Sequence, residues 1–302
     1  MRKKAAQVVD SCKVLLSQKT IQEIYELLKA RRITRLWIEA DYTNITMYRK
    51  YCQSFPGIMV SDSNRMDLLL KSMRAVKTAE EIACIAEAQR MTDDTFNYII
   101  DRIKPGRTER EIMLDMEFYM RSLGSEGVSF DFIVVSGKNS SLPHGVPTDK
   151  PVETGDFVTM DFGAVYKGYH SDMTRTVAVG KVSDEQSKVY HTVLEAQRRA
   201  IEFAAPGKVC KDVDAIAREY IYKEGYCGCF GHGLGHSVGV EIHEEPAFNT
   251  RCETKIMPGM VITVEPGIYL ENKFGVRIED MILATETGVQ NLTFSPKELL
   301  CL

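Results

Sequence analysis

Two similar stretches of the sequence each carry an acidic residue at the same position. The stretches are GDFVTMDFG at residues 155–163 and GMVITVEPG at residues 259–267. Asp161 in the first matches Glu265 in the second, and a further acid follows each of them, Asp172 and Glu279. Buried together, these carboxylates would repel one another and lose their hydration, and a divalent metal removes that conflict. The pattern therefore predicts a metal centre.

Histidines in motif-like settings support this prediction. His144 lies in LPHGVP, His243 lies in IHEEP, and His232 and His236 share GHGLGH. The glycines argue against a helix, so this is not the HExxH arrangement of helical zinc proteases. In an extended strand His232 and His236 would lie on one face, because they are an even number of residues apart. A single histidine of this kind would most simply be structural, whereas the four together favour a functional site.

The acidic stretches must be held by matching elements. Each pair of acids flanks a turn-like segment, residues 166–168 in the first stretch and 271–275 in the second, so each pair can face across paired strands. Around the stretches, EAQR at 87–90 recurs at 195–198, and a Pro-Gly-base motif also recurs in order. Landmarks repeated in order indicate a duplication. We expect a pseudo-symmetric α+β domain with helices outside a curved antiparallel sheet.

A smaller domain precedes this one. Residues 1–74 alternate β-rich and helical pieces, which is typical of a small α/β domain. The β-rich pieces are 8–16, 36–39 and 57–61, and the helical ones are 21–30 and 44–52. Thr78 and Glu81 have the spacing of a capping box, which predicts the start of a long helix toward Asp101. The main domain is therefore expected over residues 75–302.

The composition excludes several functional classes. The apolar content of 44% and the charged content of 26% are those of an ordinary globular protein. A net charge of −4 gives no reason to expect nucleic acid or anionic membrane as a partner. No apolar run reaches the roughly 18 residues of a membrane span, and the N-terminus lacks the apolar core of a signal peptide. The scattered cysteines favour free thiols in a reduced, cytoplasmic setting.

The main domain resembles the metallopeptidases with the pita-bread fold, which include methionine aminopeptidase, aminopeptidase P, prolidase and the related creatinase. The matching segments are HGVP at 144–147, MDFGAVYKGYHSDMTRT at 160–176, GHGLGHSVG at 231–239, HEEP at 243–246, TVEPGIY at 263–269 and VRIED at 276–280. They extend over roughly residues 78–300. The resemblance implies two pseudo-symmetric halves around a dinuclear metal site.

By this resemblance two divalent metal ions are held by Asp161, Asp172, His236, Glu265 and Glu279. Asp172 and Glu279 would bridge the ions, Asp161 would complete one ion, and His236 with Glu265 would complete the other. Carboxylates with one imidazole suit Mn²⁺, Co²⁺, Zn²⁺ or Fe²⁺. The resemblance to prolidase and aminopeptidase P favours Mn²⁺. Two such ions can lower the pKa of a shared water molecule for attack on a carbonyl.

The resemblance also implies roles for the residues around the ions. Glu265 would carry a proton from the water to the leaving nitrogen. His243 would hydrogen-bond the substrate or stabilise the oxyanion, and His144 would act on the substrate side. His232 would line the proline side of the pocket. Arg277, two residues before the last ligand, would contact the substrate or support a carboxylate.

Arg277 also separates the branches of the family. Its position resembles prolidase and aminopeptidase P, and methionine aminopeptidases carry a different sequence there. The expected reaction is hydrolysis of the bond between an N-terminal residue and proline, by an Xaa-Pro dipeptidase or an Xaa-Pro aminopeptidase. That bond has no N–H donor, because proline lacks one. The expected partners are peptides with proline at the second position, together with a second copy of the chain in a homodimer.

Two other functions stay open. One is a non-catalytic pita-bread protein that binds a peptide or a partner, which the intact set of ligands and histidines disfavours. The other is a methionine aminopeptidase, which Arg277 and the N-terminal domain disfavour. That domain is shorter than in prolidases and aminopeptidases P. The oligomeric state and the choice between dipeptides and longer peptides are therefore left open.

Overall fold

The chain divides into two compact units in the computed structural model, which describes residue 9 and residues 12–302. The boundary lies between Lys71 and Ser72, close to the one expected after residue 74. No helix within the described residues is long and apolar enough to cross a membrane.

The first unit is a small α/β arrangement. Its elements are α2 (Thr20–Ala30), β1 (Arg35–Trp37), α3 (Ile45–Ser54) and β2 (Met59–Ser61), and α4 (Arg65–Ala75) runs across the boundary. β1 and β2 form a parallel pair with Leu36 opposite Val60. The helices and strands expected between residues 20 and 61 are present within a few residues.

The prediction of one strand in this unit is wrong for those of its residues that the structure describes. The β-rich piece at 8–16 has no strand at residue 9 or at 12–16. Leu15 and Leu16 are exposed there. Among the described strands, β1 and β2 pair only with each other. An apolar run forms a strand only when it pairs with a neighbouring strand, and none of the described strands pairs with this run.

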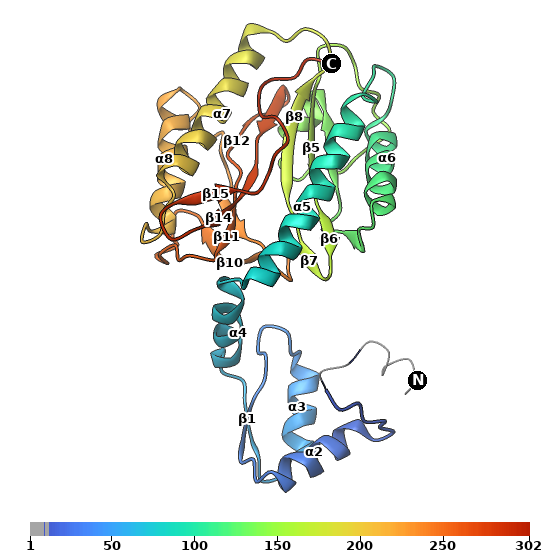
Figure 1. Ribbon diagram of the computed structural model, residues 1–302, viewed down its shortest axis with the longest axis vertical. Helices are drawn as coiled ribbons and strands as arrows, with labels where there is room; N and C mark the ends of the chain where they lie inside the picture. The colour runs from blue at the N-terminus through green and yellow to red at the C-terminus, as the bar shows by residue number, and fades with distance from the viewer. Residues whose placement is uncertain (1–8, 10–11) are drawn as a thin grey trace. The chain divides into compact units, whose positions relative to one another are not determined.

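The second unit contains two similar halves, each with two helices outside antiparallel strands (Figure 1). The first half comprises α5 (Ala79–Ile100), α6 (Glu109–Ser122), β3 (Gly127–Val128), β4 (Ile133–Ser136), the 3₁₀ helix η1 (Gly137–Ser141), β5 (Phe157–Phe162), β6 (Ala164–Tyr166), β7 (Tyr169–His170) and β8 (Met173–Ala178). The second comprises α7 (Asp184–Phe203), α8 (Cys210–Lys223), β9 (Gly235–Ser237), β10 (Glu244–Phe248), β11 (Val261–Val264), β12 (Gly267–Leu270), β13 (Phe274–Arg277), β14 (Asp280–Ala284) and β15 (Val289–Asn291).

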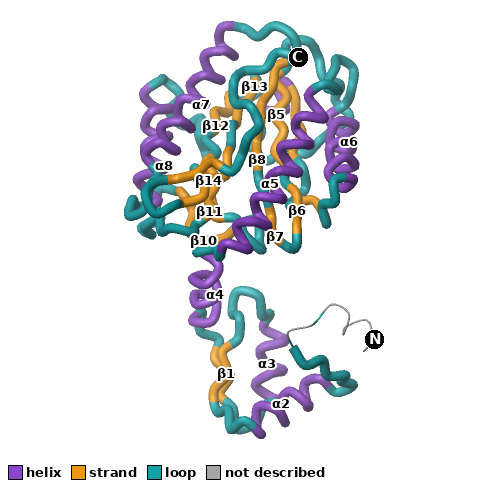
Figure 2. Tube along the Cα trace, viewed as in Figure 1, coloured by secondary structure: helices purple, strands orange, loops and turns teal. Residues whose placement is uncertain are grey.

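The duplicated stretches fold alike, as predicted. In the first half β5 pairs with β8, and β6 and β7 form a hairpin between them. In the second half β11 pairs with β14, and β12 and β13 form the corresponding hairpin. All four pairings are antiparallel, and the strands lie between the two helix pairs (Figure 2). The predicted α+β architecture with open antiparallel sheets is confirmed.

Each half buries its own apolar core between helices and strands. In the first half Phe96 of α5 and Met116 of α6 pack with Met160 of β5. In the second half Val193 of α7 packs in a cluster with Ile262 of β11. The predicted capping box at the start of α5 is present, with the Glu81 amide donating to Thr78 Oγ1 at 3.3 Å and the Thr78 amide donating to Glu81 Oε2 at 2.7 Å. This packing against the helices holds the strands that carry the acids.

Glycine permits a close backbone crossing where the first hairpin leaves β5. A Cβ atom on Gly163 would lie 1.9 Å from the Ser171 carbonyl oxygen, which belongs to the returning chain just before Asp172. In the second half a Cβ atom on Gly235 would lie 1.9 Å from the Thr263 carbonyl oxygen. Any side chain at these positions would separate the segments that carry the acids.

We expect Gly163→Ala to destabilise the protein by about 3 kcal/mol, because the backbone must move to remove the overlap. Gly127→Ala is the matched control, since a Cβ atom there meets nothing within 4 Å. The control should change the free energy of unfolding by no more than about 0.5 kcal/mol. Thermal or urea unfolding measures both. Equal stability of the two variants would contradict the proposed crossing.

Candidate metal centre

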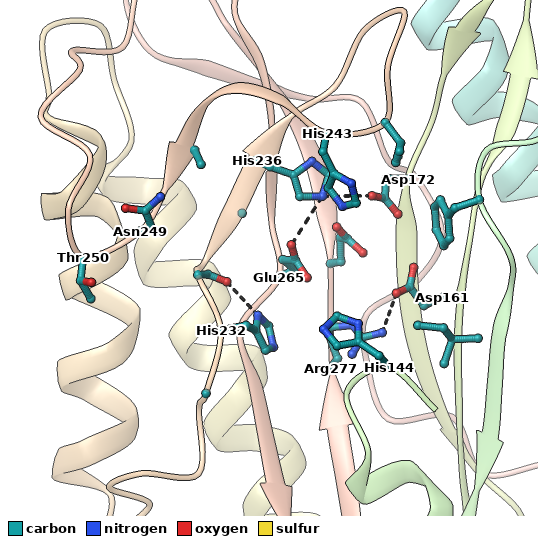
Figure 3. A pocket seen from close by; sticks show the side chains of 18 of the residues that line it. His144, Asp161, Asp172, His232, His236, His243, Asn249, Thr250, Glu265 and Arg277 are labelled. Carbon is teal, nitrogen blue, oxygen red and sulfur yellow. Dashed lines mark hydrogen bonds and ion pairs between the residues drawn. The ribbon is translucent and has the colours of Figure 1, made fainter. Parts of the chain in front are cut away.

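The candidate acidic ligands lie where the β5–β8 and β11–β14 pairs meet the hairpins. Asp161 is on β5 and Asp172 directly precedes β8. Glu265 directly follows β11, and Glu279 lies between β13 and β14. The equivalent positions in the two halves therefore face one cavity of about 630 Å³ (Figure 3). The structure brings together all four acids that the repeat singled out.

His236 joins this group from β9. Its Nε2 atom lies 3.4 Å from Asp172 Oδ2 and 3.7 Å from Glu265 Oε1. Ligand atoms of Asp172, His236 and Glu279 all lie within 4.8 Å of one another. Oxygen and nitrogen ligands about 2.1 Å from one ion are at most about 4.2 Å apart. The cluster is therefore close to the size of a coordination sphere.

Three carboxylate oxygens in the cavity are buried without a hydrogen-bond partner among the described residues. They are Asp161 Oδ1, Asp172 Oδ1 and Glu279 Oε1. Burying an acceptor without a partner is costly, and more so when it is charged. Hard, anionic oxygens beside one imidazole are the ligand set that divalent cations such as Mn²⁺ prefer. The residues present therefore fit the metal ions expected from the sequence.

The electrostatics of the metal-free cavity lead to the same conclusion. Burial is the largest cause that raises the pKa of Asp172, Glu265 and Glu279 well above that of an ordinary carboxyl group. The next cause is a neighbouring carboxylate: Asp161 for Asp172, Glu279 for Glu265, and Asp172 for Glu279. A cation between these groups would offset both the lost hydration and the repulsion.

Arg277 connects the two halves of the centre. Its side chain is 4% exposed, and Nη2 donates to Asp161 Oδ2 at 2.6 Å. Its Nε donates to Thr174 Oγ1 at 3.0 Å, and Thr174 in turn donates to Glu279 Oε2 at 2.7 Å. One guanidinium thus orients a carboxylate from each half. The remaining oxygens of Asp161 and Glu279 are the unpartnered ones.

The other edge of the guanidinium reaches the histidine side of the cavity. Arg277 Nη1 donates to the Pro143 carbonyl at 3.0 Å and to the Tyr269 hydroxyl at 2.8 Å. That hydroxyl lies 2.8 Å from His232 Nε2. His232 Nδ1 lies 2.8 Å from the Gly233 carbonyl, to which it can only donate, so Nε2 accepts the Tyr269 hydroxyl proton. Burial and then Arg277 lower the pKa of His232 to about 4, so its ring is neutral near pH 7.

His144, His236 and His243 also line the cavity. The rings of His236 and His243 meet edge to face with their centroids 4.4 Å apart. Burial, followed by the charge of His236, lowers the pKa of His243. His144 follows Pro143, whose carbonyl accepts from Arg277 Nη1 (Figure 3). Every site residue predicted from the sequence therefore borders this one cavity, while the roles assigned to these residues stay predictions.

Sequence reasoning was wrong about the conformation around His232. The strand β9 spans only Gly235–Ser237, and His232 lies in the bend before it. The His232 carbonyl accepts from Arg218 Nη2 of α8 at 2.6 Å, so a side chain takes the place of a strand neighbour. His232 and His236 therefore do not share one face of a single strand.

Sequence reasoning missed Thr174 and the hydrogen bonds of Tyr269. Thr174 stands opposite Asp161 in the β5–β8 pairing and two residues after Asp172. Tyr269 lies an even number of residues after Glu265, along the adjoining strand. Polar residues at even spacing from a predicted ligand are the signal that could have found both.

Comparisons with known proteins give consistent results. The family model for metallopeptidase family M24 matches residues 83–286. The Xaa-Pro dipeptidase of Pyrococcus furiosus is 43% identical over 282 residues, which cover 93% of this chain and 79% of that protein. The uncharacterized peptidase YqhT of Bacillus subtilis is 44% identical over 284 residues, with the same coverage of 93% and 79%.

Solved structures match almost the whole chain. The Xaa-Pro dipeptidase from Bacillus anthracis superposes with a TM-score of 0.94 at 41% identity, over 100% of this chain and 84% of that one. The prolidase from Pyrococcus furiosus superposes with a TM-score of 0.89 at 40% identity, over 97% of this chain and 85% of that one. The match to these prolidase structures confirms the predicted pita-bread fold.

Metal should stabilise the protein in a pH-dependent way. In the metal-free protein the folded-state pKa values of Asp172, Glu265 and Glu279 lie above their unfolded values. These groups make their full contribution to the free energy of unfolding below the ordinary carboxyl pKa of about 4. That contribution is lost as the pH rises through the raised pKa values. A cation replaces the protons, so we expect Mn²⁺ to raise the Tm more at about pH 8 than at about pH 5.5.

Thermal unfolding of chelator-treated protein, with and without Mn²⁺ at each pH, measures this increment. Glu279→Gln should lose most of it, and Glu286→Gln, which changes an exposed glutamate, should keep it. An increment that is equal at the two pH values, or that survives in Glu279→Gln, would contradict a metal site built from these carboxylates.

Proposed function

Because this chain belongs to metallopeptidase family M24, we propose that it is a metal-dependent peptidase that hydrolyses the bond between an N-terminal residue and proline. One observation carries the proposal: a single cavity holds the candidate ligands, three further histidines and Arg277. The specificity for proline is supported by relatives named Xaa-Pro dipeptidase, at 43% and 40% identity.

The proposed metal ligands are the five that the resemblance selects. Asp161, Asp172, His236, Glu265 and Glu279 would hold two divalent ions, and Mn²⁺ is the ion that we propose. When bound, these ions supply the Lewis acidity that activates water for attack on the scissile carbonyl. The unpartnered oxygens of Asp161, Asp172 and Glu279 support this assignment.

Glu265 is the residue that we propose transfers the proton to the leaving nitrogen. One of its oxygens, Oε1, faces His236, which leaves Oε2 to take up a proton and return it to the proline nitrogen. Burial and then Glu279 raise the pKa of Glu265 in the metal-free site. The leaving nitrogen needs this proton, because an unprotonated nitrogen would have to depart as a strongly basic anion.

The histidines and Arg277 would bind and orient the peptide. His243, whose lowered pKa keeps it neutral, can donate an N–H to the oxygen that becomes negative. His144 would contact the substrate from the loop after η1. The neutral His232, held by Tyr269, would form the wall beside the proline ring, where no positive charge is needed. Arg277 keeps Asp161 and Tyr269 in place.

A homodimer and a reduced, cytoplasmic setting belong to the same proposal. All eight cysteines are free thiols, which supports the reduced setting. The homodimer is supported by the resemblance to prolidase and aminopeptidase P. The two alternatives are a non-catalytic peptide-binding protein and a methionine aminopeptidase, and hydrolysis assays separate them.

The substrate assay uses three peptides, Ala-Pro, Ala-Pro-Ala and Met-Ala-Ser. We expect the metal-stripped protein to release alanine from a proline-containing peptide only after Mn²⁺ is added. The ratio of Ala-Pro to Ala-Pro-Ala cleavage measures the preference for dipeptides. Release of methionine from Met-Ala-Ser alone would instead identify a methionine aminopeptidase. Absence of all three reactions in protein shown to bind metal would identify a non-catalytic relative.

Glu265→Gln should lower kcat by roughly 10²–10⁴-fold, because glutamine cannot take up the proton. Glu271→Gln, which changes an exposed glutamate in the turn between β12 and β13, is the matched control and should retain activity. Metal content measured on the same preparations separates the loss of a ligand from the loss of a proton acceptor. Retained turnover in Glu265→Gln would show that another group moves the proton.

A further inference from the structure

Two ion pairs tie the segment before α5 to the loop that carries His243. Arg74 Nη1 lies 2.7 Å from Glu241 Oε1, and Lys77 Nζ lies 3.1 Å from Glu244 Oε2. The partners are 167 residues apart in both pairs. Two basic side chains that are three residues apart in the chain therefore hold two acidic side chains that are also three residues apart. His243 lies between those acids, next to Glu244.

The inner pair is almost fully buried. The side chains of Lys77 and Glu244 are 2% and 4% exposed. The Lys77 amide donates to the Gly259 carbonyl at 2.9 Å, so the backbone of Lys77 is fixed against the strand region of the second half. A buried ion pair whose charges both have partners is rigid, whereas removing one partner leaves an uncompensated charge. The pair is thus a fixed point for the chain around Glu244.

The Glu244 carboxylate fills the inside of the loop of residues 239–244. Its Oε1 accepts from the Glu241 amide at 3.3 Å. A Cβ atom on Gly239 would lie 2.5 Å from Glu244 Oε2, so glycine leaves room for the carboxylate. The Gly239 carbonyl in turn accepts from the His170 amide at 2.9 Å. The position of this carboxylate therefore determines the path of the loop.

The His243 ring depends on that path. The ring forms no hydrogen bond with any of the described residues. It contacts the His236 ring, at a centroid distance of 4.4 Å. Backbone placement therefore decides where the ring points. Glu244, the residue that follows His243, is also the first residue of β10. A loop held at Glu241 and at Glu244 is fixed on both sides of His243.

We propose that Lys77 and Arg74 are positioning residues that hold His243 over the metal centre through Glu244 and Glu241. This inference rests on the proposed function, in which His243 donates to the substrate oxygen. It assigns a task in the reaction to a segment that lies outside the matched site motifs and does not border the cavity. Lys77 has the larger effect of the two, because its pair is buried and that of Arg74 is about one-third exposed.

Hydrogen exchange of the full-length protein tests the structural part of the proposal without using activity. The variant is Lys77→Met/Glu244→Gln, which removes both charges and so leaves no lone buried carboxylate. Amides of residues 239–244 should exchange about tenfold faster or more than in the unaltered protein. Lys150→Met is the control, because it removes another partly buried ion pair, with Asp156, away from the cavity. Unchanged exchange in 239–244, or equal acceleration in the control, would overturn the proposal.

Kinetics on Ala-Pro test the functional part. The double variant should lower kcat about tenfold or more with little change in KM, since the contact that it weakens is made in the transition state. In the His243→Ala background the same two changes should cause no further loss, because their effect passes through His243. A further loss as large as in the unaltered protein would overturn the positioning role. If the unaltered protein cleaves neither Ala-Pro nor Ala-Pro-Ala, the proposed function fails, and the exchange result still decides whether the ion pairs hold the loop.

Discussion

The centre of the protein is constrained by mutual repulsion among four carboxylates that are largely withdrawn from water. Two unit charges about 4 Å apart repel by about 4 kcal/mol at an effective dielectric constant of about 20. The guanidinium of Arg277 offsets one of these charges directly, through Asp161. Thr174 offers a hydrogen bond to Glu279 but no charge. The unpartnered oxygens that are left need cations, so the interior is complete only with metal bound.

The architecture follows from this requirement. Each half contributes an acid at the end of an outer strand and a second acid where the chain returns from its hairpin. Apolar clusters pack between the helices and the strands that carry the acids, and one of them joins Phe157 of β5 to residues of the second half. The duplication thus supplies ligands in equivalent positions. His232, His236, His243, Arg277 and Tyr269 belong to the second half and His144 belongs to the first, so the surroundings of the acids are asymmetric.

Much of this fold could be predicted from the sequence, because its strongest signals are local. The matched acids, the turn segments and the Thr78 capping box each depend on residues close together in the chain, and all of them are present in the structure. The strand expected at 8–16 is absent from the described residues of that range. A strand needs a pairing partner, and the periodicity of a sequence does not reveal whether one is present. Helix α4 was missed although residues 61–64, Ser-Asp-Ser-Asn, provide N-cap residues directly before it.

The candidate site was predicted less completely than the fold. The residues named from the sequence all border one cavity, and their individual roles await experiment. The contacts of Thr174 and Tyr269 depend on cross-strand register, and the bonds that join Lys77 to Glu244 span 167 residues. Interactions between residues so far apart leave no pattern in a single sequence. Long-range polar contacts are therefore the part of such a site that only a structure reveals.

The division of the ligands between the two halves also affects when the site can form during synthesis of the chain. Arg277 and Asp161, which meet in the centre, are 116 residues apart in the chain. At a synthesis rate of about 5–20 residues per second, Asp161 leaves the ribosome roughly 6 to 23 seconds before Arg277 does. During that interval the first half carries two acids without the opposing strand that completes the centre. The nascent chain therefore has no finished site for metal, and loading must wait until translation has passed the last hairpin.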